Sequence, residues 1–332
     1  MSVQGGVVTP SRAYDRYTSR QLAVLVPTKD RPGKLRKLLE SLDAQSQPVG
    51  RIIVIDGGES VLDVVAEFQD RLPVEHHICR PPGQIRQRNM GIARVSGETP
   101  LVASLDDDIA LEPEAVARMI DFWNRAETET AAVSFNIINE PSEPRSRIKE
   151  LLGLSAPEPG RVLRSGASTS NCSVSRDVRV EWLCGGATVW RLAVLQEHLH
   201  RELSGRWAIA EDLIFSYPIG RQYPLYVCAS ARVLHEHVFD YRAKSLPRFH
   251  GRTRTLWTFY FVEANRELSR TAYLWRMTLI TVGKIAVGIV TLNAEPLQFA
   301  LGQIEGVAAG LKALARGGDV ADAIELESKR VP

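Results

Sequence analysis

Short apolar runs alternate with segments of helical periodicity along the first half of the chain. Two apolar runs rich in branched aliphatic residues, 22–26 and 52–55, predict buried strands. Residues 101–105 predict a further strand, and residues 74–78 a short one. Apolar residues recur at helical spacing in the segments between and after them: 34–42, 61–68, 84–95 and 113–123. This alternation predicts βαβ units, and therefore an α/β fold with a Rossmann-type, mostly parallel mixed sheet flanked by helices.

The second half of the chain has a less regular pattern. Three further strands are predicted: 131–138, 225–229 and 232–234. Prolines and serines interrupt the segment 139–180, which predicts a long loop with one short helix near 148–152, and a helix near 192–195 follows Gly185-Gly186. These changes predict three parts: a polar arm (1–20), an α/β domain (21–240) and a helical C-terminal region (241–332).

The composition excludes several classes of protein. Hydrophobic residues make up 44% and charged residues 24% of the 332 residues, which is typical of a globular protein. A net charge of +2 gives no global field that favours nucleic acid, so no nucleic-acid partner is expected. The four cysteines show no CxxC spacing, and the N-terminus has no apolar signal-peptide core, so a cytoplasmic location is expected.

Carboxylates and glycines follow three of the predicted strands. Asp30 comes after the first strand, Asp56-Gly57-Gly58 after the second, and Asp106-Asp107-Asp108 after the fourth. In parallel sheets the carboxyl ends of the strands lie at one edge, and ligands bind there. These residues are therefore expected to meet at one edge of the sheet.

The aspartate triplet, residues 106–108, has two interpretations. Adjacent carboxylates repel one another unless a cation or solvent separates them, and a divalent metal shared with substrate phosphates would do so. A solvated turn with a helix cap explains an isolated triplet equally well. The buried strand that directly precedes the triplet favours a metal site.

Three other groups of residues are candidates for chemistry. Arg86, Arg88 and Arg94 lie on a predicted helix after Pro81-Pro82-Gly83 and suit a diphosphate, although a solvated basic face is the alternative. Glu211-Asp212 offers a general base, but the pair alone is better explained as a helix cap. His235 and His237 flank Glu236 and could complete a metal site, although surface histidines are more frequent.

The order of these motifs resembles that of the family 2 glycosyltransferases, which have a nucleotide-sugar-binding GT-A fold. Seven pieces carry the resemblance: VLVPTKDRPGKLRKLLESL (24–42), IIVIDGGES (52–60), RQRNMGIARVSGE (86–98), LDDDIALEP (105–113), CGGATVWRLAVL (184–195), AEDLIFSYPIG (210–220) and ARVLHEH (231–237). The resemblance implies that the α/β domain, 21–240, is catalytic.

The resemblance implies a role for each matching residue. Those around the nucleotide would be Pro27, Thr28 and Asp30 at the base and ribose, Asp56 at the base, and Arg88-Asn89 on the adjoining helix. Those around the sugar and diphosphate would be Asp106, Asp107, Gly185 and Gly186, with Asp108 and His235 at the metal. Asp212 would deprotonate the acceptor hydroxyl, and Glu211 would support acceptor binding.

The implied activity is transfer of a sugar from a nucleotide-sugar to a hydroxyl of a glycan or lipid-linked glycan, as in polysaccharide biosynthesis. The implied cofactor is Mg²⁺ or Mn²⁺, and the implied mechanism is a single inverting displacement. No QxxRW motif follows Asp212, which argues against a processive synthase.

Other functions fit the sequence less well. A catalytically silent nucleotide-sugar-binding or scaffold protein is the alternative, but the intact set of Asp106, Asp108 and Asp212 disfavours it. A nucleotidyltransferase or a dinucleotide-dependent dehydrogenase would need a glycine-rich phosphate loop after the first strand, where this chain has VPTKDRP.

The C-terminal region carries an apolar segment, 277–292, preceded by interleaved arginines and aromatic residues. The segment is shorter than the ~20 residues that span a bilayer. Basic and aromatic residues around apolar helices suit the membrane interface, while packing on the catalytic domain or in a dimer is the alternative. Peripheral association with the cytoplasmic face of a membrane is expected, and would suit a lipid-linked acceptor.

Overall fold

The computed structural model describes residues 16–140, 146–202, 209–236 and 246–328. Most of the predicted N-terminal arm, and His237, lie outside the described residues. The chain divides into two compact units, each treated separately below. Unit 1 comprises Met1–Ser142, Asn171–Arg201 and Phe215–Glu236, and unit 2 comprises Glu143–Ser170, Glu202–Ile214 and His237–Pro332. This division differs from the boundary predicted at residue 240. Residues 143–170 and 202–214 belong to unit 2, together with the C-terminal helices.

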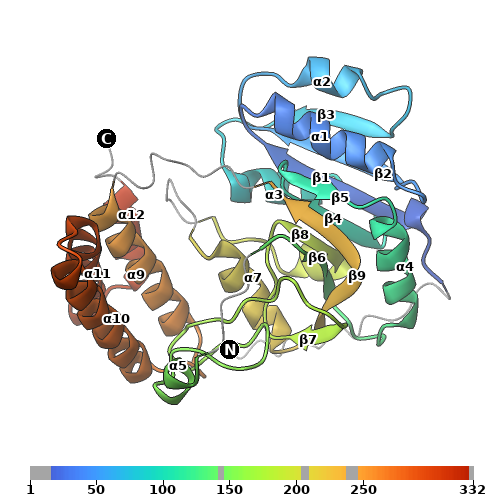
Figure 1. Ribbon diagram of the computed structural model, residues 1–332. Helices are drawn as coiled ribbons and strands as arrows, with labels where there is room; N and C mark the ends of the chain where they lie inside the picture. The colour runs from blue at the N-terminus through green and yellow to red at the C-terminus, as the bar shows by residue number, and fades with distance from the viewer. Residues whose placement is uncertain (1–15, 141–145, 203–208, 237–245, 329–332) are drawn as a thin grey trace, which may run out of the picture. The chain divides into compact units, whose positions relative to one another are not determined.

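Four parallel strands form one half of the sheet in unit 1, as predicted (Figure 1). They are β1 (Leu22–Thr28), β2 (Arg51–Asp56), β3 (Val74–Ile78) and β4 (Leu101–Leu105), in the order β3-β2-β1-β4. The side chains of β1, β2 and β4 are largely buried on both faces, which explains why their sequences are continuous apolar runs. Strand β3, with the sequence VEHHI, lies at the edge of the sheet and is only partly buried. Because the four strands are parallel, their carboxyl ends lie at one edge.

The other half of the sheet is mixed. It contains β5 (Ile109–Leu111), β6 (Ala132–Ile137), β7 (Val178–Val180), β8 (Ala187–Arg191) and β9 (Leu225–His235). Strand β8 is antiparallel to both β4 and β6, while β6 and β9 are parallel. Strands β5, β7 and β8 were not predicted, and the two strands expected after residue 225 are one.

Helices cover both faces of this sheet (Figure 1). On one face lie α1 (Pro32–Asp43), α2 (Leu62–Ala66) and α4 (Ala115–Arg125). On the other lie α3 (Gln84–Ile92), α6 (Leu192–Glu197) and the C-terminal part of α7 (Glu211–Gly220). Helix α1 buries Leu35, Leu38, Leu39 and Leu42, as their spacing predicts. The α/β class and its flanking helices are thus confirmed.

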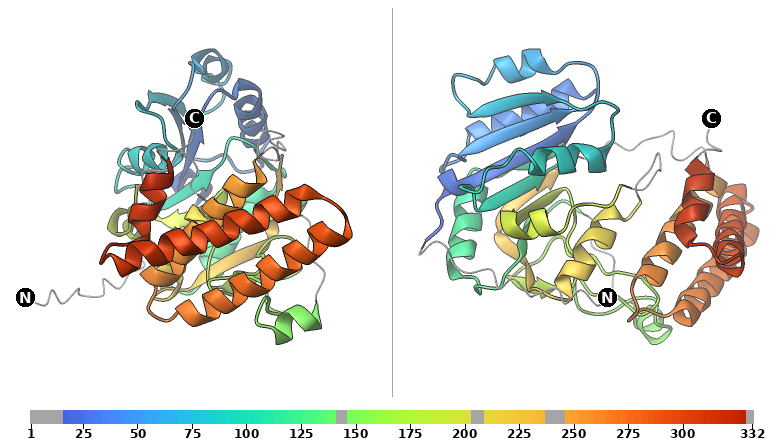
Figure 2. Two further views of the ribbon diagram at one scale, coloured as in Figure 1. Left: turned by 90° about the vertical axis from the view of Figure 1, so that its left-hand side faces the viewer. Right: turned by 180° about the vertical axis from the view of Figure 1, so that it is seen from behind.

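Unit 2 is helical. Its elements are α5 (Arg147–Leu151), α9 (Pro247–Ala264), α10 (Arg270–Val290), α11 (Ala294–Ala315) and α12 (Val320–Ser328), and Figure 2 shows α10 and α11 as two long neighbouring helices. Glycines bring α9 and α11 close together, since a Cβ on Gly302 would lie 1.9 Å from the carbonyl oxygen of Arg248. Further along the same pair of helices Phe259 lies against Gly310, and its ring stacks on Tyr273 with centroids 4.7 Å apart.

Helix α10 is longer than the apolar segment suggested. It has 21 residues, a mean hydropathy of 1.4 over its most apolar 18-residue window, and only 17% of that window is buried. By length and composition, it is the one helix among the described residues that could cross a membrane.

Candidate active site

The carboxyl edge of the parallel strands brings the aspartate triplet against the end of β1. Thr28, the last residue of β1, donates a hydrogen bond of 2.7 Å from its hydroxyl to Asp107. Burial raises the pKa of Asp107 to about 6, against the Thr28 hydrogen bond and the charge of Arg31, which lower it. Asp107 therefore takes up a proton at a higher pH than an ordinary aspartate does.

Asp108 pairs with His235 because β5, which follows the triplet, runs antiparallel to the end of β9. In that register Ile109 lies opposite His235. The His235 Nε2 lies 3.2 Å from Asp108, and its Nδ1 lies 3.3 Å from Glu140. Burial alone would raise the pKa of Asp108, but the hydrogen bond and charge of His235 outweigh it and lower that pKa. Burial would likewise lower the pKa of His235, and its carboxylate neighbours raise it.

Arg31 was not predicted as a site residue, yet it bridges two of the carboxylates. Its Nη1 lies 3.0 Å from Asp107 and 3.2 Å from Asp108, while half of the side chain is exposed. Arg31 immediately precedes Pro32, the first residue of α1, so the start of this helix fixes its position. The sequence signal that could have identified Arg31 is a basic residue between a strand and a helix N-terminus at this edge of the sheet.

Asp106 faces helix α3 and the glycine pair. Its carboxylate accepts a hydrogen bond of 2.8 Å from the buried Arg88, and its backbone N–H donates to the Gly186 carbonyl. A Cβ on Gly186 would lie 2.7 Å from the Asp106 carboxylate, so any larger residue here would displace that carboxylate. The structure therefore brings together Arg88, the triplet and Gly185-Gly186.

Gln87, which was also not predicted as a site residue, connects α3 to the ends of β1 and β2. Its side-chain N–H groups donate to the carbonyls of Thr28 (2.8 Å) and Ile55 (2.7 Å), the ends of β1 and β2. The neighbouring Asn89 uses both ends of its amide on the backbone of His200. Gln87 and Asn89 thus hold α3 in position, and Arg88 between them reaches the triplet.

Three residues expected at the nucleotide have local structural roles. The carboxylate of Asp56 is fully buried and accepts hydrogen bonds from the N–H groups of Gly58 and Val61. Pro27 is buried within β1. Asp30 has a left-handed backbone (φ +57°), and its carboxylate accepts a hydrogen bond of 2.6 Å from the Glu59 N–H. That bond and the nearby Lys29 lower the pKa of Asp30. Together they shape the loops after β1 and β2.

The residues at this edge fit a divalent cation. Among the described residues, no cluster of three or more histidine, cysteine or acidic side chains is arranged to hold a metal. The Asp108–His235 pair instead offers one carboxylate and one imidazole within 3.2 Å of each other. Mg²⁺ and Mn²⁺ are commonly held by one or two protein side chains together with substrate phosphates. The pair suits such an incomplete protein ligand set.

Glu211 and Asp212 lie in the first turn of α7, where acidic side chains favourably oppose the helix dipole. The Asp212 carboxylate accepts a hydrogen bond of 2.8 Å from the N–H of Leu213. Both residues belong to unit 2, whereas the triplet belongs to unit 1. Their catalytic roles stay predictions.

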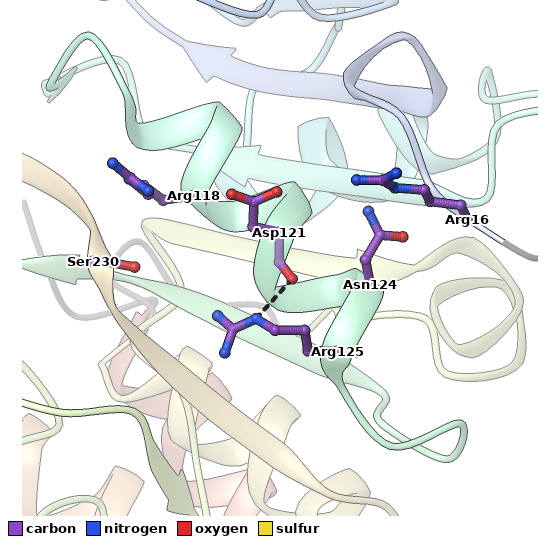
Figure 3. A pocket seen from close by; sticks show the side chains of 6 residues that line it. All are labelled: Arg16, Arg118, Asp121, Asn124, Arg125 and Ser230. Carbon is purple, nitrogen blue, oxygen red and sulfur yellow. Dashed lines mark hydrogen bonds between the residues drawn. The ribbon is translucent and has the colours of Figure 1, made fainter.

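A separate pocket of about 420 Å³ lies beside α4 in unit 1 (Figure 3). Its lining residues are Arg16, Arg118, Asp121, Asn124, Arg125 and Ser230. The amide of Asn124 bonds the backbone of Tyr17, which precedes β1, so the pocket lies toward the opposite edge of the sheet from the triplet. Apart from Asn124 its lining is exposed. Arg125 lies in the last turn of α4, where a positive charge favourably opposes the helix dipole.

Residues 23–179 match the family model described as Glycosyl transferase family 2. A curated relative, "Uncharacterized glycosyltransferase YwdF" from Bacillus subtilis (strain 168), is 30% identical over 131 residues, which are 38% of this chain and 48% of the relative. The match thus spans about half the length of that relative. The resemblance found in the sequence is confirmed over this part of the chain.

Solved structures with the same architecture extend the likeness to nearly the whole chain. The crystal structure of S. aureus TarS 1-349 has a TM-score of 0.52 at 16% identity and covers 93% of this chain and 90% of its own. A mannosyltransferase from Pyrobaculum calidifontis, in complex with GDP-Man and Mn²⁺, has a TM-score of 0.54 at 13% identity and covers 90% and 91%. At these identities the likeness shows the fold, and confirms the predicted GT-A architecture.

Proposed function

We propose that this chain, a GT-A fold protein whose residues 23–179 match family 2 glycosyltransferases, transfers a hexosyl or related sugar from a nucleotide-sugar to an acceptor hydroxyl. The observation that carries the proposal is the pairing of Asp108 with His235 beside Asp106 and Arg88 at the carboxyl edge of the sheet. At this edge a carboxylate–imidazole pair that suits a divalent metal lies next to a buried arginine that suits a nucleoside diphosphate.

Asp108 and His235 would hold Mg²⁺ or Mn²⁺. The bound ion would neutralise charge on the diphosphate of the leaving nucleotide. Arg88 is held by its contact with Asp106 and would supply a fixed positive charge at the same edge. The closely packed Gly185-Gly186 backbone would line the sugar without side-chain obstruction. A GT-A relative with bound Mn²⁺ supports the choice of a divalent cation.

Asp212 would act as the general base for an acceptor hydroxyl on a glycan or lipid-linked glycan, with Glu211 assisting. Transfer would then proceed by one inverting displacement. A catalytically silent sugar-nucleotide-binding protein is the second candidate, and would bind the donor without turning it over.

The donor half of the proposal is tested by calorimetric titration of UDP, GDP and dTDP with and without Mn²⁺. We expect one nucleotide to bind only with the metal, and Asp108→Ala to abolish that binding. Asp121→Ala removes an exposed carboxylate of α4 in the same unit and serves as the matched control. Absence of nucleotide binding under every condition would contradict the proposal.

The catalytic half is tested by Asp212→Asn. We expect nucleotide affinity to be unchanged and transfer to fall by about 10²–10⁴-fold, the usual contribution of a general base. Glu211→Gln is the matched comparison and should lose less activity. Wild-type turnover by Asp212→Asn would reject the assigned base, and donor binding without turnover by the wild type would favour the silent alternative.

We also infer that unit 2 associates with the cytoplasmic face of a membrane. The C-terminal part of α10 exposes apolar side chains, among them Val287, Ile289 and Val290, which are 51%, 62% and 82% exposed. Replacement of all three by serine should reduce co-sedimentation with vesicles several-fold, since each removes buried apolar area at the interface. If the wild type did not bind vesicles but self-associated, and the same replacements abolished that self-association, a second copy of the chain would cover α10 instead.

A further inference from the structure

A cavity of about 440 Å³ lies wholly within unit 2, between the segment 152–165 and the start of α10. Its lining residues are Leu152, Gly153, Ala156, Glu158, Arg161, Val162, Leu163, Arg164, Ser165, Ala272 and Trp275. The volume is in the range of small-ligand sites. None of these residues belongs to the candidate active site.

The polar part of the cavity favours an anion. Ser165 is 4% exposed, and among the described residues nothing forms a hydrogen bond with its hydroxyl. A buried hydroxyl without a partner is costly unless a ligand or water satisfies it. Two arginines, Arg161 and Arg164, line the cavity together with one acidic residue, Glu158. No described carboxylate pairs with Arg164.

The start of α10 adds to this positive potential. Ala272 lies in the first turn of this 21-residue helix, whose N-cap is Ser269. The Ser269 N–H donates a hydrogen bond of 2.7 Å to the carbonyl of Arg164, so the arginine loop is fixed to the helix N-terminus. The positive end of a long helix dipole stabilises a nearby anion.

A tight turn holds Arg164 and Ser165 in place. Leu163 and Ala167 are joined by a backbone hydrogen bond of 2.7 Å, and Gly166 closes the turn with a left-handed backbone (φ +74°). A Cβ on Gly166 would lie 2.5 Å from a methyl group of Val262 on α9. The turn is therefore packed directly on a helix, which pre-organises its polar groups.

The apolar part of the cavity continues onto exposed hydrophobic surface. Trp275 is 55% exposed, and its indole N–H lies 3.4 Å from the carbonyl oxygen of Leu152. Leu151 and Ile148 on the adjoining α5 are 88% and 71% exposed. Tryptophan beside aliphatic side chains and arginines is typical of surfaces at a membrane interface. A ligand with an anionic head and an apolar tail fits both parts.

We propose that this cavity binds the phosphate group of a membrane lipid. Arg164, Arg161 and the Ser165 hydroxyl contact the phosphate oxygens at the N-terminus of α10, and Trp275 with Leu152 contacts the apolar chain. The site is distinct from the proposed transfer site, and its occupancy does not depend on the transfer reaction.

The test is co-sedimentation of the full chain with phosphatidylcholine vesicles that contain or lack phosphatidic acid. We expect phosphatidic acid to increase binding, and Arg164→Ala to lower that affinity about tenfold, as expected for a charge-assisted contact with phosphate. Arg316→Ala removes the same charge from an exposed position at the end of α11 and should change it less than twofold. Ser165→Val should weaken binding without any change in net charge.

Equal losses in Arg164→Ala and Arg316→Ala would overturn the proposal, because binding would then reflect net charge alone. Titration with inorganic phosphate and glucose 1-phosphate distinguishes the source of the phosphate. The lipid assignment would be overturned if inorganic phosphate or glucose 1-phosphate bound tightly, if Ser165→Val abolished that binding, and if phosphatidic acid had no effect on vesicle binding. The cavity would then be assigned to a soluble phosphate. Far-ultraviolet circular dichroism establishes that each variant is folded, and unchanged nucleotide binding separates this site from the donor site.

Discussion

Each carboxylate of the aspartate triplet has its own partner. Asp106 accepts a hydrogen bond from Arg88, Asp107 from Thr28, and Asp108 lies beside His235. Adjacent carboxylates in a partly buried turn repel one another unless each is compensated separately. The three partners come from α3, β1 and β9, so the triplet is held by elements far apart in the chain.

Arg31 is expected to compete with a metal for Asp107 and Asp108. Arg31→Ala should increase the affinity for Mn²⁺ in the absence of nucleotide by about two- to fivefold, the equivalent of ~0.5–1 kcal/mol for a half-exposed ion pair. Calorimetric titration of Mn²⁺ measures this, with Arg31→Lys as the charge-conserving control. Weaker Mn²⁺ binding in Arg31→Ala would show that the arginine supports the metal site.

His200 is expected to make unit 1 sensitive to acid. Its ring stacks on Phe215 at 3.6 Å, and burial together with the charge of Arg88 lowers its pKa to about 3. The unfolded chain, with an ordinary histidine pKa near 6.5, binds a proton first as the pH falls, so this contribution to stability is lost from about pH 6.5 downward.

Between pH 7 and pH 5 the unfolding free energy of the wild type should therefore fall by about 1–2 kcal/mol more than that of His200→Phe. Urea denaturation at both pH values provides the comparison. The phenylalanine preserves an aromatic ring on Phe215 and removes the titrating group. Parallel pH profiles for the two proteins would contradict the assignment.

At the scale of elements, packing determines which glycines can be replaced. In Gly302→Ala the new methyl group would lie 1.9 Å from the backbone carbonyl oxygen of Arg248, so α11 would have to move away from α9. Overpacking of this kind costs about 1–3 kcal/mol of unfolding free energy. Gly283→Ala is the matched control, because nothing lies within 4 Å of its Cβ position in α10.

Chemical denaturation should show Gly302→Ala less stable than the wild type, and Gly283→Ala more stable by up to about 1 kcal/mol from helix propensity. If Gly302→Ala were as stable as the wild type, the close contact between α9 and α11 would not exist.

Apolar runs also determined which elements could be predicted. The strands β1, β2 and β4 are buried on both faces, so their sequences are unbroken apolar runs between turn residues. Strand β8 is equally buried but continues directly into α6. Periodicity cannot distinguish a short apolar strand from the helix that follows it without a break. Strand β5 has three residues and is defined only by its pairing with β9.

At the scale of the molecule, nucleotide should stabilise the chain only when the metal is also present. At a free nucleotide concentration of 100 times Kd, the expected gain in unfolding free energy is about 2.7 kcal/mol. Thermal denaturation with nucleotide, with Mn²⁺, and with both measures it. Removal of Mn²⁺ by a chelator should abolish the gain, as should Asp108→Ala. Equal stabilisation by nucleotide alone would argue against a metal-dependent site.

The sequence by itself determined the α/β class, the parallel strands and the clustering of Asp30, Asp56 and the triplet at one edge. These follow from local periodicity and from the rule that parallel strands end on the same side. Tertiary structure decided which side chains face a ligand and which hold the scaffold. Arg31 bridges two aspartates, while Asp56 is buried and Asn89 is bonded to His200.

Tertiary structure also decided how the chain divides, since residues 143–170 group with the C-terminal helices and form a cavity there. Neither outcome can be read from local sequence. The partners of a side chain and the surface that buries a segment lie up to hundreds of residues away, and only folding brings them within hydrogen-bond distance.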